Sequence, residues 1–142
     1  MAAMVAVALA AAFASAAIYI NVAEHPARLG LADGAALAQW HPSYKRGFMM
    51  QGTLAVASSL AGVVAWWAFG GWLWPAGAAL MLANWPFTLL VIMPVNHALE
   101  AMLGQAHAQP RALLVRWGQL HGVRSLLGCA GTLCYLIAAG MR

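Results

Sequence analysis

Two apolar segments of the chain each carry polar side chains at the spacing of one helical face. In the first, Trp117, His121 and Arg124 follow one another at i, i+4 and i+7. An imidazole titrates near neutral pH and can act as a general base where a pocket opens beside it. His121 is therefore a candidate base. The alternative is that a single histidine near a membrane interface hydrogen-bonds a neighbouring helix.

The second stripe, at i, i+3, i+4 and i+7, consists of Asn21, Glu24, His25 and Arg28. Antiparallel helices would bring both stripes to the same end of a bundle. Because a charge inside hydrocarbon is costly, Arg124 should face the interior and have a partner. Glu24 lies at the matching depth, so we predict a Glu24–Arg124 ion pair. This pair either only holds two helices together or belongs to a functional site, and both interpretations stay open.

Three amides extend the polar set. Gln51 lies one helical turn into an uncharged segment from the same end, Asn96 closes the next segment there, and Asn84 lies near its middle. Pro86 removes a backbone donor and leaves a carbonyl that an amide can satisfy, which favours a structural role for Asn84.

Histidines raise the question of a metal or haem. Two axial ligands for a transmembrane haem would project from two helices at matching depth, and only His97 with His121 approaches this arrangement. Neither C-x-x-C-H nor H-E-x-x-H occurs, so the sequence assigns no cofactor and leaves a metal or haem open. The five histidines are His25, His41, His97, His107 and His121.

The elements that must position these residues are membrane helices. Hydrophobic residues make up 64% of the 142 positions and charged residues 7%, against about 25% in soluble domains. Residues 47–99 contain no charged side chain, a length that exceeds the roughly 20 residues of one crossing. A turn at Gly70–Gly71 must therefore divide them. The tryptophans around it predict an interfacial belt: Trp66, Trp67, Trp72 and Trp74.

The predicted fold is all-α, a single integral membrane domain built as a four-helix transmembrane bundle. The first twenty residues lack the Lys or Arg that opens a secretory signal peptide, so we expect a retained helix. Residues 34–40, bracketed by Pro26 and Pro42, predict a short surface helix between spans one and two. The four spans are expected at about residues 1–22, 48–69, 72–96 and 118–140.

Positive charge predicts the orientation. The two polar connections, residues 22–46 and 97–117, carry five Lys and Arg, whereas the opposite side carries only Arg142. By the positive-inside rule these connections face the cytoplasm, which puts both termini outside a cell inner membrane.

Four segments together resemble the small four-helix membrane proteins grouped with anthrone oxygenases. They are N-V-A-E-H-P (21–26), W-H-P-S-Y-K-R-G (40–47), N-W-P-F-T-L-L-V-I-M-P-V-N (84–96) and W-G-Q-L-H-G-V-R (117–124). Most members of this grouping have no assigned function, and the others are implied to oxidise an anthrone carbon to a quinone with molecular oxygen. The polar signature of the family would fall on Asn21, Glu24, Trp40, Tyr44, Asn84, Asn96, Trp117, His121 and Arg124.

This chemistry needs a base near an acidic benzylic C–H and a cation near the developing oxyanion, but no metal. The resemblance implies His121 as base, Arg124 as cation and Glu24 as the residue that orients Arg124. Aromatic rings could stack on a flat substrate that arrives from the lipid. The expected substrate-binding residues are Asn21, Trp40, Tyr44, Gln51, Asn84, Asn96 and Trp117.

Two classes of function remain. One is an oxygen-dependent oxidoreductase that acts on a lipophilic aromatic, anthrone- or quinol-like, molecule. The other is a non-catalytic membrane protein: a small-molecule carrier, an accessory subunit or an assembly factor. An open aromatic pocket would favour the first, and polar residues packed shut around the Glu24–Arg124 pair the second. The expected partners are the lipid bilayer and an aromatic small molecule; a homo-oligomer is left open, and no nucleic-acid signature occurs.

Overall fold

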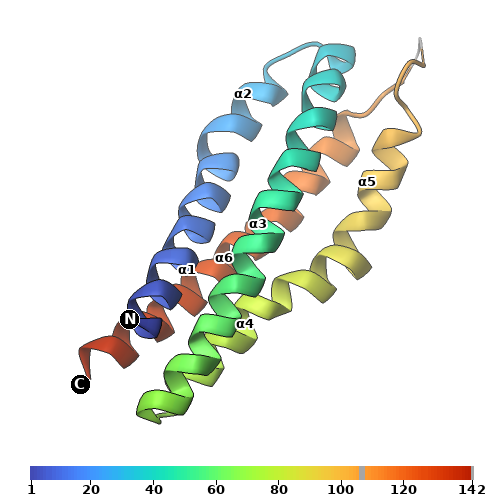
Figure 1. The fold of residues 1–142 in the computed structure, drawn as a ribbon. Coiled ribbons are helices and arrows are strands. Elements are labelled where there is room, and N and C mark those ends of the chain that lie inside the picture. Colours follow the sequence, from blue (N-terminus) through green and yellow to red (C-terminus); the bar gives the residue numbers. More distant parts are fainter. Residues whose placement is uncertain (106–107, 142) are drawn as a thin grey trace.

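A computed structural model describes residues 1–105 and 108–141 of the chain, and these residues form helices and turns without a strand. Three elements join end to end into the first long helix, and three others into the third (Figure 1). The elements are α1 (Ala2–Tyr19), η1 (Ile20–Glu24), α2 (His25–Leu29), α3 (Asp33–Phe69), α4 (Leu73–Phe87), η2 (Thr88–Ile92), α5 (Met93–Glu100) and α6 (Arg111–Gly140).

The predicted all-α four-helix architecture is confirmed. α1 packs against α3 and α6, and α4 packs against the same two helices on the other side, which gives a bundle of four (Figure 1). Each long helix is apolar enough to cross a membrane. At 1.5 Å per residue the 28 residues of Ala2–Leu29 span about 42 Å, which exceeds a hydrocarbon core of about 30 Å. The bundle fits an integral membrane protein.

The segment expected as a separate surface helix is instead the first part of α3. Residues 34–40 are helical, but the helix continues without interruption through Pro42 to Phe69. Pro42 removes one backbone hydrogen bond, and its ring lies on the exposed face, where it does not disturb the packing inside the bundle. The second helix therefore extends well beyond the predicted span on the side of the polar connections.

Two π-helical turns interrupt the first and third long helices. In η1 the N–H of His25 donates to the carbonyl of Ile20, and in η2 that of Met93 donates to Thr88, five residues earlier in each case. A proline follows each turn closely, Pro26 in one and Pro94 in the other. A π turn adds one residue to the helix, so side chains on its two sides no longer share one face. Such turns are frequent at functional sites.

In the half of the bundle near the termini, the helices pack closely around Tyr135. Tyr135 is fully buried, and its hydroxyl donates a hydrogen bond to the carbonyl of Ser58 at 3.1 Å. Its ring occupies space that a side chain at Gly62 or Gly77 would need. Trp74, expected in the interfacial belt, is buried beside Tyr135 with 5.6 Å between the ring centroids, which corrects the prediction. The other three belt tryptophans are exposed: Trp66, Trp67 and Trp72.

Candidate functional site

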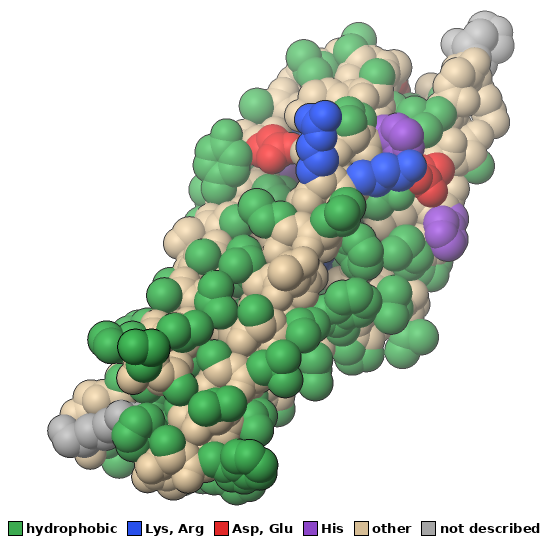
Figure 2. Space-filling model, viewed as in Figure 1, with side chains coloured by type: hydrophobic (Ala, Val, Ile, Leu, Met, Phe, Trp, Pro, Cys, Tyr) green, Lys and Arg blue, Asp and Glu red, His purple; other side chains and the backbone are tan. Residues whose placement is uncertain are grey.

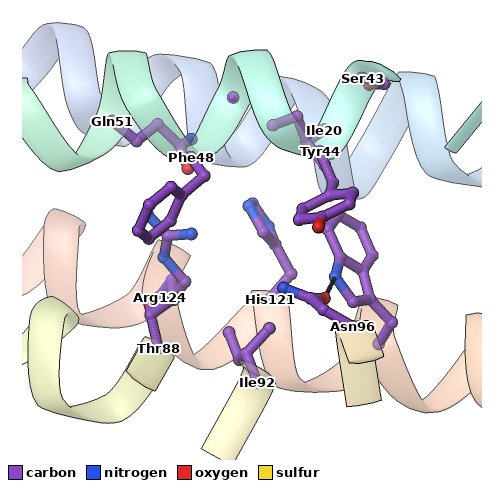
Figure 3. A pocket seen from close by; sticks show the side chains of 12 residues that line it. Ile20, Ser43, Tyr44, Phe48, Gln51, Thr88, Ile92, Asn96, His121 and Arg124 are labelled. Carbon is purple, nitrogen blue, oxygen red and sulfur yellow. Dashed lines mark hydrogen bonds between the residues drawn. The ribbon is translucent and has the colours of Figure 1, made fainter. Parts of the chain in front are cut away.

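The polar residues gather at the end of the bundle away from the termini (Figure 2). Between the four long helices this end encloses a small cavity of about 20 Å³, which has room for a water molecule. Six predicted site residues line it: Tyr44, Gln51, Asn96, Trp117, His121 and Arg124. The other six lining residues are Ile20, Ser43, Gly47, Phe48, Thr88 and Ile92 (Figure 3).

His121 is held in one tautomer by Asn21. The amide nitrogen of Asn21 donates to the carbonyl of Gly118 at 2.9 Å, so the amide oxygen is the atom that faces His121. This oxygen lies 2.8 Å from Nδ1 of His121 and also accepts a hydrogen bond from the Ser125 hydroxyl at 2.8 Å. Nδ1 therefore carries the hydrogen. In the neutral ring Nε2 is then an acceptor, and it makes no hydrogen bond to any described residue.

Trp117 fixes the ring of His121 from one side. The two rings stack with 5.1 Å between centroids and 25° between planes. The indole N–H of Trp117 donates to the side-chain oxygen of Asn96 at 2.9 Å. Trp117 thus holds the candidate base His121 by stacking, and Asn96 of α5 holds Trp117 by a hydrogen bond.

Trp40 and Tyr44 continue this aromatic wall. Their rings stack at 4.3 Å, and Trp40 meets Trp117 edge-on at 6.3 Å. The hydroxyl of Tyr44 donates to the carboxylate of Glu100 at 2.6 Å, which joins α3 to α5. Tyr44 lines the cavity, whereas Trp40 is fully buried behind it. Trp40 therefore supports the wall from outside the cavity.

The predicted Glu24–Arg124 ion pair is wrong. Glu24 instead pairs with Arg28, four residues later, and also accepts a hydrogen bond from Ser43. Arg28 is a second buried cation, and it also contacts the side chains of His25 and Gln39. The nearer cation on the same helix thus takes the carboxylate, an i, i+4 pairing that the sequence spacing already contained.

Arg124 is left without a carboxylate. The residue is 5% exposed, its guanidinium makes no ion pair in the described part of the chain, and its Nε lacks a hydrogen-bond partner there. The guanidinium carbon lies 5.7 Å from the centre of the Phe13 ring, close enough for a cation–π contact. A buried cation that lines a cavity without a counter-charge can receive an anionic oxygen.

Two buried amides beside Arg124 also have unused polar atoms. Neither the oxygen nor the nitrogen of the Gln51 amide has a partner among the described residues, and the same holds for the oxygen of Asn84. The Asn84 nitrogen donates to the carbonyls of Leu80 and Met81, which agrees with the structural role expected for it. A second cavity of about 10 Å³ lies between Asn84 and Arg124. Gln51, Asn84 and Arg124 thus leave donors and acceptors available at the centre of the bundle.

Comparison with known proteins identifies the family of the chain. The model of a family described as anthrone oxygenase matches residues 40–134. The chain belongs to this family. The anthrone oxygenase family match includes every cavity-lining residue except Ile20.

Two curated relatives are fungal proteins of the same description. The anthrone oxygenase tpcL of Aspergillus fumigatus is 49% identical over 33% of this chain and 32% of its own length. An anthrone oxygenase of Claviceps purpurea is 37% identical over 41% of this chain and 38% of its own length. The matched segments thus cover about a third of the length of each of these relatives. No solved structure matches significantly.

The histidines of this anthrone oxygenase family member do not converge. His25 lies between the carbonyl of Leu114 and the guanidinium of Arg28, and His41 approaches Glu100. His97, the expected companion of His121, is exposed on α5. No group of three or more His, Cys, Asp or Glu side chains suited to a metal occurs within residues 1–105 and 108–141. His107 and Arg142 lie outside the described residues.

Sequence reasoning missed Phe48 and Thr88, which line both cavities. The spacing contains the signal, because Phe48 lies one turn after Tyr44 and Thr88 one turn after Asn84. It also missed Ser43, whose hydroxyl bonds Glu24. Two expected substrate-binding residues, Asn21 and Trp40, do not line a cavity and instead support its walls.

Proposed function

We propose that the protein is an oxygen-dependent membrane oxidoreductase that converts the benzylic CH2 of an anthrone-type substrate to a carbonyl. The observation that carries the proposal is that one cavity is lined both by an oriented base, His121, and by a cation without an ion-pair partner among the described residues, Arg124. Asn21 sets the tautomer of His121, and Arg124 lines the same cavity without a carboxylate partner in the part of the chain that the structure describes. Membership of the anthrone oxygenase family supports the substrate class.

The reaction begins with proton removal. Nε2 of His121 takes one benzylic proton, and the resulting enolate places negative charge on the oxygen of the anthrone carbonyl group, which Arg124 stabilises. The enolate passes one electron to dioxygen, and the carbon radical and superoxide combine to form a C–O bond. The protonated His121 returns its proton to the peroxide and then removes the second proton from the same carbon. The O–O bond breaks, which leaves a carbonyl and releases hydroxide, and the second proton converts this hydroxide to water. One dioxygen is consumed for each CH2 oxidised.

Oxygen uptake with a purified protein tests this proposal. His121→Ala should lower the rate by about 100-fold or more, since a positioned base contributes about 10²- to 10⁴-fold. His121→Gln should not restore the rate, because an amide cannot take the proton. His97→Ala is the matched control, since it removes an exposed histidine of α5 and should leave the rate unchanged. Wild-type protein without oxygen uptake on any anthrone or hydroquinone, or a fully active His121→Ala variant, would contradict the proposal.

The size of the cavity favours a second candidate, a non-catalytic membrane protein. The enclosed space of about 20 Å³ is far below the roughly 300–1,000 Å³ of ordinary ligand pockets. The polar end would then be a structural network. Ligand binding to the wild-type protein separates the two candidates: an enzyme that admits its substrate should bind an anthraquinone analogue of it, whereas a closed structural network should not. Loss of stability in His121→Ala is expected in both cases, because His121 is buried and hydrogen-bonded. An absorption spectrum of the purified protein tests the remaining alternative, a bound haem.

We also propose a location for the site within the cell. With the polar connections in the cytoplasm and the termini outside an inner membrane, the cavity lies near the cytoplasmic surface. A lipophilic aromatic molecule dissolved in the bilayer would reach it from the side.

A further inference from the structure

An open groove lies beside the small cavity, on the outside of the bundle between α1 and α3. It encloses about 560 Å³, within the range of small-molecule pockets. Its lining combines apolar or aromatic side chains, such as Tyr19 and Met50, with the charged side chains of Glu24 and Arg46. Charged side chains in Figure 2 gather at this end of the molecule.

The groove and the cavity share a thin wall. Ile20, Ser43 and Gly47 line both spaces. Gly47 contributes no side chain, and the end of the Ile20 side chain lies 3.9 Å from the place where a Cβ of Gly47 would be. The hydroxyl of Ser43 is held by Glu24, so Ile20 is the movable part of the wall. Rotamer changes of such side chains are fast compared with catalysis.

A second groove, between α3 and α4, is closed off more firmly. It encloses about 480 Å³ and shares only Phe48 with the larger cavity. The ring of Phe48 packs edge-on against Trp85, with 5.8 Å between centroids. The indole N–H of Trp85 is held by the carbonyl of Gly52 at 3.2 Å. The packed rings of Phe48 and Trp85 thus separate this groove from the cavity, whereas the α1–α3 groove is separated from it by the aliphatic side chain of Ile20.

The charges of the α1–α3 groove indicate its ligand. Glu24 is matched by Arg28, whereas Arg46 makes no ion pair in the described part of the chain. The groove is therefore an apolar surface with one unmatched positive charge. A flat aromatic molecule with a phenolate or carboxylate group fits both features.

We propose that an aromatic substrate with an anionic oxygen enters from the membrane through the α1–α3 groove and reaches His121 past Ile20, through the opening at Gly47. The proposal rests on the proposed function for the substrate class. It also reduces the mismatch in size, because most of the ring system would remain in the groove while the central ring, which carries both the CH2 and the carbonyl oxygen, reaches His121 and Arg124.

Substitutions that fill or widen the opening between the groove and the cavity test the route in the whole chain. Gly47→Leu fills the opening and should raise KM for an anthrone substrate by about tenfold or more, with a smaller rise for Gly47→Ala. Ile20→Ala widens the opening and should not raise KM. The matched control is Ala57→Leu, which fills the α3–α4 groove and should leave KM unchanged.

Binding of anthraquinone-2-carboxylate, followed by calorimetry, gives a readout that does not require turnover. Gly47→Leu should weaken binding, and Arg46→Gln should weaken it for this anion but not for neutral anthraquinone. Wild-type protein that binds the probe but consumes no oxygen would leave the route standing and contradict the oxidoreductase. Unchanged binding and KM in Gly47→Leu, a larger effect of Ala57→Leu, or a wild-type groove that retains phospholipid and excludes the probe would overturn the route.

Discussion

At the scale of single residues, the chemistry of His121 is determined by Asn21. The Asn21 amide is oriented by the carbonyl of Gly118, and its oxygen then accepts the Nδ1 hydrogen of His121. Without this acceptor the imidazole could carry its hydrogen on either nitrogen and turn about its side-chain bonds. Asn21 is therefore interpreted as a positioning residue that keeps the Nε2 lone pair available.

Asn21→Ala should lower kcat by about 10- to 100-fold, a part of the contribution of a positioned base, while KM stays close to the wild-type value. Nitrogen-15 NMR of the histidine rings should show a mixture of tautomers for His121. Ser125→Ala is the comparison, because it removes only the second donor to Asn21 and should change kcat less. An Asn21→Ala variant that changes KM alone, with the wild-type tautomer retained, would refute the positioning role.

The corrected ion pair gives a prediction about stability. Breaking a buried pair costs about 3–5 kcal/mol, and the cost is smaller here because the Glu24 side chain is 21% exposed. We expect Glu24→Gln and Arg28→Gln to lower the free energy of unfolding by about 1–3 kcal/mol each, and the double variant to recover part of the loss. Thermal unfolding in detergent measures the cycle. Glu24→Gln with Arg124→Gln should be additive; coupling in that pair instead would restore the original assignment.

At the scale of helices, composition was sufficient to predict the fold. A charge-free stretch too long for one crossing, divided at Gly70–Gly71, predicts two antiparallel helices, and both glycines adopt the positive φ that such a turn uses. The ends of the helices were harder to predict from the sequence. Pro26 and Pro42 indicated boundaries, but the helix runs through each of them, because a π turn precedes one and the other lies on an exposed face.

The same π turn explains why the site was predicted only in part. A period of 3.6 residues places Asn21 and Glu24 on one face, but both lie within η1, where the wider π turn rotates them away from each other. Asn21 then bonds Gly118 of α6, whereas Glu24 bonds Ser43 of α3. The stripe on α6 contains no such turn, and its predicted residues Trp117, His121 and Arg124 do line one cavity. Helical spacing predicts neighbours where the helix is regular.

At the scale of the whole molecule, the two ends of the bundle differ in packing and charge. In the terminal half small residues pack around Tyr135, and the other end contains the polar cavity and the polar connections. Arg111 ties these connections together, through Asp33 at 2.7 Å and the carbonyl of Leu31. The closely packed half can thus hold the four helices in place around the polar cavity.

The orientation of this asymmetric bundle is a final prediction. The five Lys and Arg of the polar connections place that end in the cytoplasm under the positive-inside rule. A cysteine at Ala108 should therefore resist a membrane-impermeant reagent added from outside, whereas one at the α3–α4 turn should react. Gly71 itself has a φ of 83°, which disfavours cysteine, so the exposed Trp72 beside it is the better position.

The labelling is measured in intact cells after both native cysteines, Cys129 and Cys134, are replaced by alanine, because they are free thiols within α6. Permeabilised cells provide the control, since both engineered positions should then react. Reaction at Ala108→Cys but not at Trp72→Cys in intact cells would invert the topology. The cavity, the α1–α3 groove and Arg46 would then face the outer leaflet, and the substrate would have to approach from that side of the membrane.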